Sequence, residues 1–258
     1  MNVLRKNKKR DARIERGNLE LYLKPTFVID CDSEAIKEKA SLLTEKCRSE
    51  REKAKELFYF VRDEIKYNPY LPFNSFDLSD YRASRTLQRG EGYCIQKAVV
   101  LTALARAVGI PARLGFADIK NHLAPDKLRE MMGTNMFVYH GYTEFWLDNI
   151  WVKATPAFNI EMCDKFDIKP VEFDGVTDAV FHERNRKGEL HIEYIRYHGA
   201  FADLPFKEIM RAFINQYGRA HVGAVEPGRD FEESLTLLRE KLEHERVETS
   251  EESKKTKD

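Results

Sequence analysis

Apolar residues recur at three- and four-residue spacing over several stretches of the chain, which predicts amphipathic helices. The longest stretch covers residues 33–65, with Ser33 as a suitable N-cap. Its periodicity is interrupted near Arg48–Arg51, so we expect two consecutive helices there. Shorter helices are predicted over residues 127–132, 205–217 and 231–246.

The most apolar helical stretch begins at Cys94 and follows a loop that contains Gly90 and Gly92. Gly109 and Pro111 end it in the usual order for a helix C-terminus. One cysteine is therefore predicted at the first turn of a buried helix, where free N–H groups and partial positive charge favour a thiolate. Free cysteine is also often a small core residue, so the pattern alone leaves both readings open.

Alternating and β-branched patterns predict strands around a two-residue turn at Asp148-Asn149, over residues 136–147 and 150–155. The turn sets a register that pairs Trp146 with Trp151, and Glu144 with Lys153 as a cross-strand ion pair. One face of this hairpin then carries His140, Tyr142, Glu144, Trp151, Lys153 and Thr155. Other strands are expected over residues 19–29 and 113–116, with a second hairpin formed by 179–183 and 189–195.

Composition and charge exclude several classes of function. Of the 258 residues, 42% are apolar, enough for a substantial core, and the formal net charge is zero. A neutral balance gives no reason to expect nucleic acid or an acidic membrane as a partner. The four cysteines form no CxxC pair, and His182, His191 and His198 show no metal-ligand spacing, so we expect no metal and no cofactor. The basic start lacks an apolar signal segment, which predicts a cytoplasmic protein with reduced thiols.

Two blocks of sequence together resemble the transglutaminase-like superfamily. GYCIQKAVVLTALARAVGIPARLGF resembles its cysteine block, and HGYTEFWLDNIWVKATP resembles its histidine–aspartate block. The resemblance covers roughly Ser33 to Phe158. It implies an α+β, papain-like fold in which helices pack on an antiparallel sheet and the cysteine helix is buried. It also implies Cys94 as nucleophile and His140 as general base.

The third residue of the family motif differs in this chain. Where the family has an aspartate that orients the imidazole, the chain has Thr155, which offers a hydroxyl but no charge. Asn159 is a nearby alternative, because an amide takes this role in papain-like enzymes. Gln88 precedes Cys94 by the spacing of the oxyanion glutamine in papain-like enzymes and is the oxyanion candidate, together with the Cys94 amide.

The predicted organisation has four parts: a basic arm (1–18), a transglutaminase-like catalytic core (19–160), a C-terminal extension packed on the core (161–230), and a charged helix with a disordered tail (231–258). The resemblance implies a cysteine-dependent protease or amidase that cleaves a peptide or amide bond through a thioester. One alternative is a catalytically impaired peptide-binding module, indicated by the loss of the aspartate. Another is a partner-binding protein that uses its C-terminal helix. The sequence determines neither the substrate, the acyl acceptor nor the oligomeric state.

Overall fold

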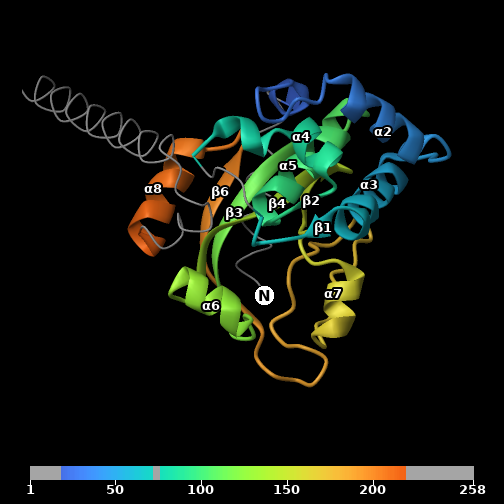
Figure 1. The fold of residues 1–258 in the computed structure, drawn as a ribbon. Helices are drawn as coiled ribbons and strands as arrows, with labels where there is room; N and C mark the ends of the chain where they lie inside the picture. The colour runs from blue at the N-terminus through green and yellow to red at the C-terminus, as the bar shows by residue number, and fades with distance from the viewer. Residues whose placement is uncertain (1–18, 72–75, 219–258) are drawn as a thin grey trace, which may run out of the picture.

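Helix α5 (Cys94–Ala107) lies at the centre of the fold (Figure 1). In the computed structural model, which describes residues 19–71 and 76–218, every residue from Ile95 to Arg106 is buried. The helix packs against a sheet on one side and against three other helices. A helix covered on all sides is apolar all round, which explains the unusually apolar stretch of sequence.

The three helices around α5 come from the segment before it. They are α2 (Glu34–Thr44), α3 (Glu50–Glu64) and α4 (Ala83–Arg89), so the prediction of two helices between residues 33 and 65 is confirmed. Ser49 caps α3 by accepting a hydrogen bond from the Glu52 amide at 3.2 Å, and the Glu52 carboxylate accepts the Arg48 amide at 2.6 Å. Ser33 precedes α2 as predicted but makes no capping bond with its side chain.

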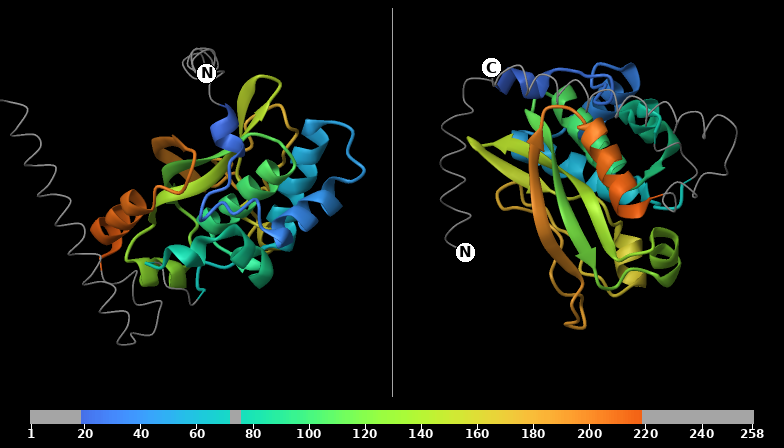
Figure 2. Two further views of the ribbon diagram at one scale, coloured as in Figure 1. Left: turned by 90° about the horizontal axis from the view of Figure 1, so that it is seen from above. Right: turned by 90° about the vertical axis from the view of Figure 1, so that its left-hand side faces the viewer.

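Four antiparallel strands form the main sheet in the order β5 (Ile150–Ala154), β4 (Met136–Leu147), β3 (Ala112–Asn121) and β6 (Ile192–Phe201). Figure 2 shows these strands side by side, with β6 in orange at one edge. A second, short sheet pairs β1 (Lys66–Tyr67) with β2 (Glu91–Gly92) in parallel, immediately before α5. This small sheet brings the segment around Tyr67 to the cysteine end of α5.

The hairpin register predicted from the sequence is confirmed. Trp146 pairs with Trp151 and Glu144 with Lys153, and the turn residues Asp148 and Asn149 both have positive φ, 48° and 65°. The predicted ion pair across the hairpin is wrong, because Glu144 binds Arg113 of β3 at 2.7 Å on its other side. The Lys153 ammonium instead lies 4.7 Å from the centre of the Tyr197 ring.

The segment after the hairpin completes the same sheet. It contains α7 (Ile160–Lys165), β6 and α8 (Phe206–Tyr217), the last as predicted. The second predicted hairpin is reduced to one bridge, Arg184↔Leu190, because β6 pairs with β3 along its whole length. The predicted arm at 1–18 and the helix over 231–246 lie outside the described residues.

The predicted strand over residues 19–29 is wrong. Its first part is a short 3₁₀ helix, Leu19–Leu23. The Arg106 guanidinium, projecting from α5, binds the Lys24 carbonyl, and also the carbonyls of Ala112 and Ala202. These backbone groups are thus satisfied by a buried arginine and not by a neighbouring strand. Two further short elements are a 3₁₀ helix at Leu78–Tyr81 and α6 (Asp126–Met132), the latter as predicted.

Candidate active site

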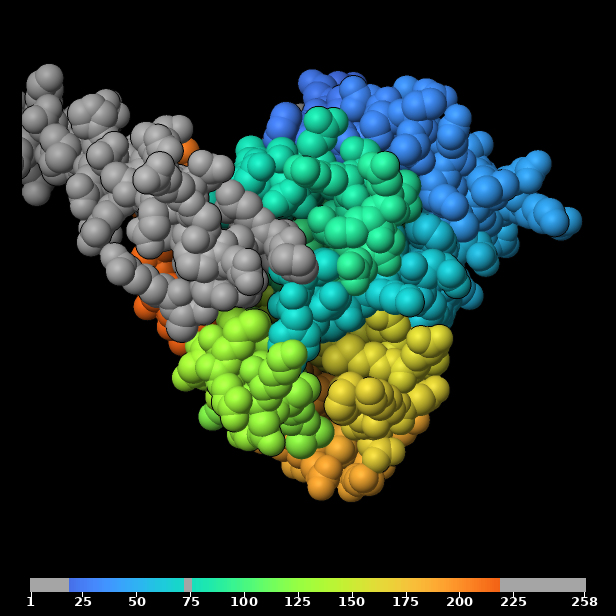
Figure 3. Space-filling model, viewed as in Figure 1, coloured from blue at the N-terminus to red at the C-terminus, as the bar shows by residue number. Residues whose placement is uncertain are grey.

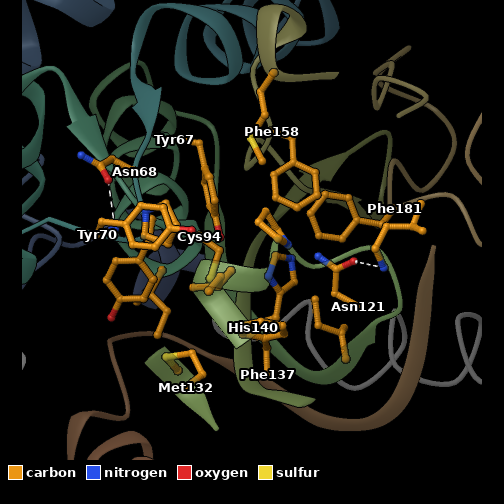
Figure 4. A pocket seen from close by; sticks show the side chains of 18 of the residues that line it. Tyr67, Asn68, Tyr70, Cys94, Asn121, Met132, Phe137, His140, Phe158 and Phe181 are labelled. Atoms are coloured by element: carbon orange, nitrogen blue, oxygen red, sulfur yellow. Dashed lines mark hydrogen bonds between the residues drawn. The ribbon is translucent and has the colours of Figure 1, made fainter. Parts of the chain in front are cut away.

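A cavity of 470 Å³ opens beside the N-terminus of α5. Its volume lies in the range usual for small-molecule sites. Helix α6, light green in Figure 3, and α7, yellow, border a hollow at this surface, and residues of both helices line the cavity. Cys94 and His140 both line it (Figure 4), so the structure brings together the predicted nucleophile and the predicted base.

Cys94 is the first residue of α5 and is partly exposed, toward the cavity. The turn before it is fastened by Gln96, whose side-chain oxygen accepts the Tyr93 amide at 3.2 Å and whose nitrogen donates to the Asp80 carbonyl at 3.1 Å. This arrangement fixes the first turn of the helix, where Cys94 lies.

The helix N-terminus favours the Cys94 thiolate, as the sequence predicted, but burial has the larger effect on the pKa. Burial raises the pKa of the Cys94 thiol to about 11, while the backbone N–H groups of Gly141, Ile95 and Cys94 act in the opposite direction and lower the pKa. The helix N-terminus does favour the thiolate, but the loss of hydration outweighs it. At neutral pH the resting residue is therefore a thiol.

Strand β4 passes very close to this end of α5. A Cβ added at Gly141 would lie 3.0 Å from the Ile95 Cα, so a larger residue would push β4 and α5 slightly apart. The Gly141 N–H lowers the pKa of the Cys94 thiol, and His140, the residue before Gly141, lines the same cavity as Cys94. The contact between β4 and α5 thus brings both residues to one cavity.

A β-bulge in β4 precedes His140. The register against β3 shifts between Ala117 and Ile119, and Tyr139 has a φ of 54°. The Asp118 carboxylate accepts the Tyr139 amide at 3.0 Å and the His198 ring Nε2 lies 2.6 Å from the same oxygen. The His198 ring also stacks on Tyr139, with ring centres 3.9 Å apart. This cluster sets the backbone from which His140 projects.

The His140 imidazole is 4% exposed and lies 4.8 Å from the centre of the Phe181 ring. Within the described residues, its Nε2 has no hydrogen-bond partner. Burial lowers the pKa of His140 to about 3, so the ring is neutral at physiological pH. A neutral imidazole can accept a proton, which is what a general base requires.

Thr155 follows β5 and is buried, but it does not line the cavity. Its amide donates to the Ala179 carbonyl at 2.9 Å. Its hydroxyl lies beside the Tyr194 hydroxyl, whose pKa it lowers. The structure therefore gives no hydrogen bond between Thr155 and His140.

Asn159 is committed to the backbone and does not line the cavity. Its oxygen accepts the Tyr67 amide at 2.6 Å, and its nitrogen donates to the Ile65 carbonyl at 3.0 Å and to two other carbonyls at the end of α3, those of Arg62 and Asp63. The Lys97 ammonium binds the same helix end, at 3.0 Å from the Arg62 carbonyl. Asn159 thus joins α3, β1 and α7 and has no free group for the imidazole.

Gln88 lies on α4 with its side chain exposed, and it borders a different hollow together with Arg85. It does not line the cavity that holds Cys94. Gln88 therefore has the sequence spacing of an oxyanion donor but does not lie at the cavity where the oxyanion would form.

Tyr67 lines the candidate active site, but the sequence analysis did not identify it, because no motif spacing relates it to Cys94. It comes from β1, lines the cavity, and extends toward Cys94 in Figure 4. Its ring packs edge-on to Phe158, with centres 5.1 Å apart. Burial raises the pKa of the Tyr67 hydroxyl well above its usual value, which keeps it a proton donor. The aromatic character of residues 66–80 was the only sequence signal for it.

Other kinds of site find no support in the described residues. No cluster of three or more His, Cys, Asp or Glu side chains there has an arrangement suited to a metal ion. None of the helices in residues 19–71 and 76–218 combines the length and apolar character of a membrane span. All four cysteines are free thiols.

A match to a known protein family covers the segment that holds the cysteine helix and the histidine hairpin. Residues 37–156 match the model of the transglutaminase-like superfamily. Among solved structures, the chain is similar to a candidate cysteine protease from Cytophaga hutchinsonii, at 14% identity and a TM-score of 0.42, over 72% of this chain and 54% of that one. It is also similar to a candidate protease from Parabacteroides distasonis, at 17% identity and a TM-score of 0.33, over 46% of this chain and 22% of that one. The chain thus spans about half the length of the first. No curated protein matches.

The fold and the family match together define the class: a mixed α/β domain with helices on an antiparallel sheet and a cysteine at the start of its central helix. Over residues 37–156, slightly less than half of its length, the chain is similar to the transglutaminase-like superfamily.

Proposed function

We propose that this protein is a thiol hydrolase that cleaves a peptide or amide bond through a thioester on Cys94. The observation that carries the proposal is that Cys94 and His140 line the same cavity. The N–H of Gly141, the residue after His140, also lowers the pKa of the Cys94 thiol. The two residues lie 46 positions apart in the sequence, on a helix and a strand, and only the fold brings them to the same cavity. The proposed substrate is a peptide or protein.

The reaction follows from the roles of the two side chains. The Cys94 sulfur attacks the carbonyl carbon while its proton passes to His140, and the carbonyl electron pair moves to oxygen. When the tetrahedral intermediate collapses, the C–N bond breaks and His140 gives its proton to the leaving amine. Water then attacks the thioester, with His140 again taking and returning a proton, and Cys94 leaves as a thiol.

In the resting site Cys94 is a thiol and His140 is a neutral imidazole, because burial disfavours both the thiolate and the imidazolium. Proton transfer from Cys94 to His140 creates both charges together, and their mutual attraction offsets part of the desolvation cost. We therefore propose that the thiolate forms as substrate binds. The Cys94 amide and the Tyr67 hydroxyl are the proposed donors to the oxyanion, in place of Gln88.

Acyl-enzyme trapping tests the proposal. The full chain is mixed with p-nitrophenyl hexanoate and examined by mass spectrometry for one hexanoyl group, mapped by peptide digestion. We expect the adduct on Cys94, its loss in Cys94→Ala, and at least a hundredfold slower formation in His140→Gln. Cys47→Ala, which removes a thiol outside the cavity, is the matched control and should behave as the wild type.

Hydrolysis of amides is then measured with fluorogenic peptidyl amides. Turnover that disappears in Cys94→Ala supports the hydrolase. Adding an alkyl amine separates hydrolysis from amide transfer, because a transferase would release an N-alkyl product in preference to the acid. Absence of any Cys94 adduct would refute the proposal.

A peptide-binding module is the second candidate. The neutral Cys94 and His140, and the threonine in place of the family aspartate, favour it. On this reading the cavity binds peptides that stay intact for hours, and Cys94→Ala leaves their affinity unchanged. Measuring binding and cleavage of the same labelled peptide distinguishes the two candidates.

A further inference from the structure

The cavity beside Cys94 has walls of one chemical kind. Its lining is dominated by aromatic and long aliphatic side chains contributed by α6, α7, α8, β1, β4 and the loops between them. Its main apolar members are Tyr70, Leu128, Met132, Phe137, Phe158, Met162, Phe181 and Phe213. Such a wall offers contact area and few hydrogen bonds.

The entrance is apolar as well. Leu123 is 36% exposed and Phe166 is 43% exposed, and both line the cavity. Large apolar side chains left in water at the mouth of a cavity mark a surface that a ligand covers.

Charged groups are confined to the rim. Glu161 and Lys165 are the only acidic or basic side chains, apart from His140, that line the cavity in the described part of the chain, and both are exposed on α7. Two deeper amides are already engaged: the Asn68 oxygen accepts the Tyr70 amide at 2.9 Å, and the Asn121 oxygen accepts the Leu123 amide at 3.0 Å. The polar groups at Cys94, His140 and Tyr67 are those proposed to act on the acyl carbonyl, so a charged group elsewhere in the cavity would lose hydration and find few partners.

We infer that the cavity binds the acyl side of the substrate and selects a large apolar acyl group, aliphatic or aromatic. This inference rests on the proposed function, because it takes Cys94 as the atom that the acyl carbon reaches. It narrows the substrate to amides whose carbonyl carries an extended hydrocarbon or an apolar side chain, and it disfavours acyl groups that end in a carboxylate.

Binding to the full-length Cys94→Ala variant tests the inference without depending on chemistry. Calorimetry is performed with N-methyl propanamide, hexanamide and octanamide, and with N-methyl succinamate as the charged comparison. Burial of each methylene is expected to strengthen binding about fourfold until the cavity is filled. Succinamate is expected to bind at least tenfold more weakly than hexanamide.

A matched pair of surface variants, each made in the Cys94→Ala chain, locates the binding site. Leu123→Asp puts a charge at the mouth and is expected to weaken octanamide binding about tenfold. Leu42→Asp changes another exposed leucine, 66% exposed on α2 and outside the cavity, and should leave binding unchanged. Both positions are exposed enough for the variants to fold, which circular dichroism checks.

The outcomes separate this inference from the proposed function. Affinity that does not change with chain length, or tighter binding of succinamate, overturns the inference even if hexanoyl transfer to Cys94 is observed. Chain-length dependence that is equal in Leu123→Asp and Leu42→Asp also overturns it, because the apolar site would then lie elsewhere. Strong chain-length dependence without any acyl adduct keeps the cavity preference and removes the hydrolase.

Discussion

At the scale of single residues, two effects act on the pKa of Cys94 in opposite directions. Its place at the start of α5 favours the thiolate, yet the surrounding protein raises its pKa to about 11. Position in a helix can be read from a sequence, whereas the solvent excluded from a side chain depends on what the fold places around it. Asn159 makes the same point: its proximity in sequence suggested an orienting role, and the fold uses its amide to join three elements.

This balance predicts the pH dependence of Cys94 alkylation. With a pKa of about 11, the thiolate fraction at pH 7 is roughly two to three orders of magnitude below that of an unperturbed cysteine. The rate of reaction with iodoacetamide should rise about tenfold per pH unit from pH 7 to 10, measured by mass spectrometry of the Cys94 peptide. A rate that is already constant between pH 6 and 8 would show a preformed thiolate–imidazolium pair and contradict this prediction.

At the scale of elements, the site depends on how β4 is bent and how closely it approaches α5. The bulge at Tyr139 and the glycine at 141 flank His140 and act together. The sequence predicted the strand and its register against β5, because local alternation and turn type determine both. It did not predict the bulge. Asp118 of β3 and His198 of β6 stabilise the bulge, and both strands lie on the side of β4 away from β5.

Removing the Asp118 carboxylate should change the position of the His140 ring, although Asp118 itself does not line the cavity. Asp118→Ala leaves the Tyr139 amide without its acceptor, and we expect a loss of about 1–3 kcal/mol in the free energy of unfolding in urea. We also expect a shift of the His140 ring signal in the NMR spectrum. Asp118→Asn keeps an acceptor oxygen and should recover most of the stability.

An unchanged His140 signal in Asp118→Ala would show that the bulge does not depend on this carboxylate. His198→Phe is the informative companion, because it keeps an aromatic ring over Tyr139 and removes only the bond to Asp118.

At the scale of the whole molecule, burial of titratable rings links stability to pH. Burial lowers the pKa of His140 to about 3 and that of His191 to about 4. Between those values and the unfolded pKa near 6.5, the unfolded chain binds more protons than the native protein. The stability contributed by these neutral rings is thus fully present above pH 6.5 and is lost as the pH falls below it.

Replacing the buried ring by one that does not titrate should reduce this dependence. In His191→Phe we expect the pH slope of the unfolding free energy between pH 6 and 4.5 to fall by up to about 1.4 kcal/mol per pH unit. Denaturant titrations across that range provide the measurement. His182→Phe is the comparison: it removes only a neighbouring charge, a smaller cause of the lowered His191 pKa than burial, and should change the slope much less.

By itself, the sequence determined the helices around residues 33–65, the cysteine helix, the β4–β5 register and the resemblance to a family over residues 37–156, because periodicity, turn residues and motif order are local properties. Only the tertiary structure decided which predicted residues share the cavity: Cys94 and His140 do, while Gln88 and Thr155 do not. It also decided that Glu144 pairs with Arg113, that residues 192–201 complete the main sheet, and that Tyr67 extends toward Cys94. The physical reason is that desolvation and contacts between distant strands depend on the packed arrangement of the whole chain, which no local pattern contains.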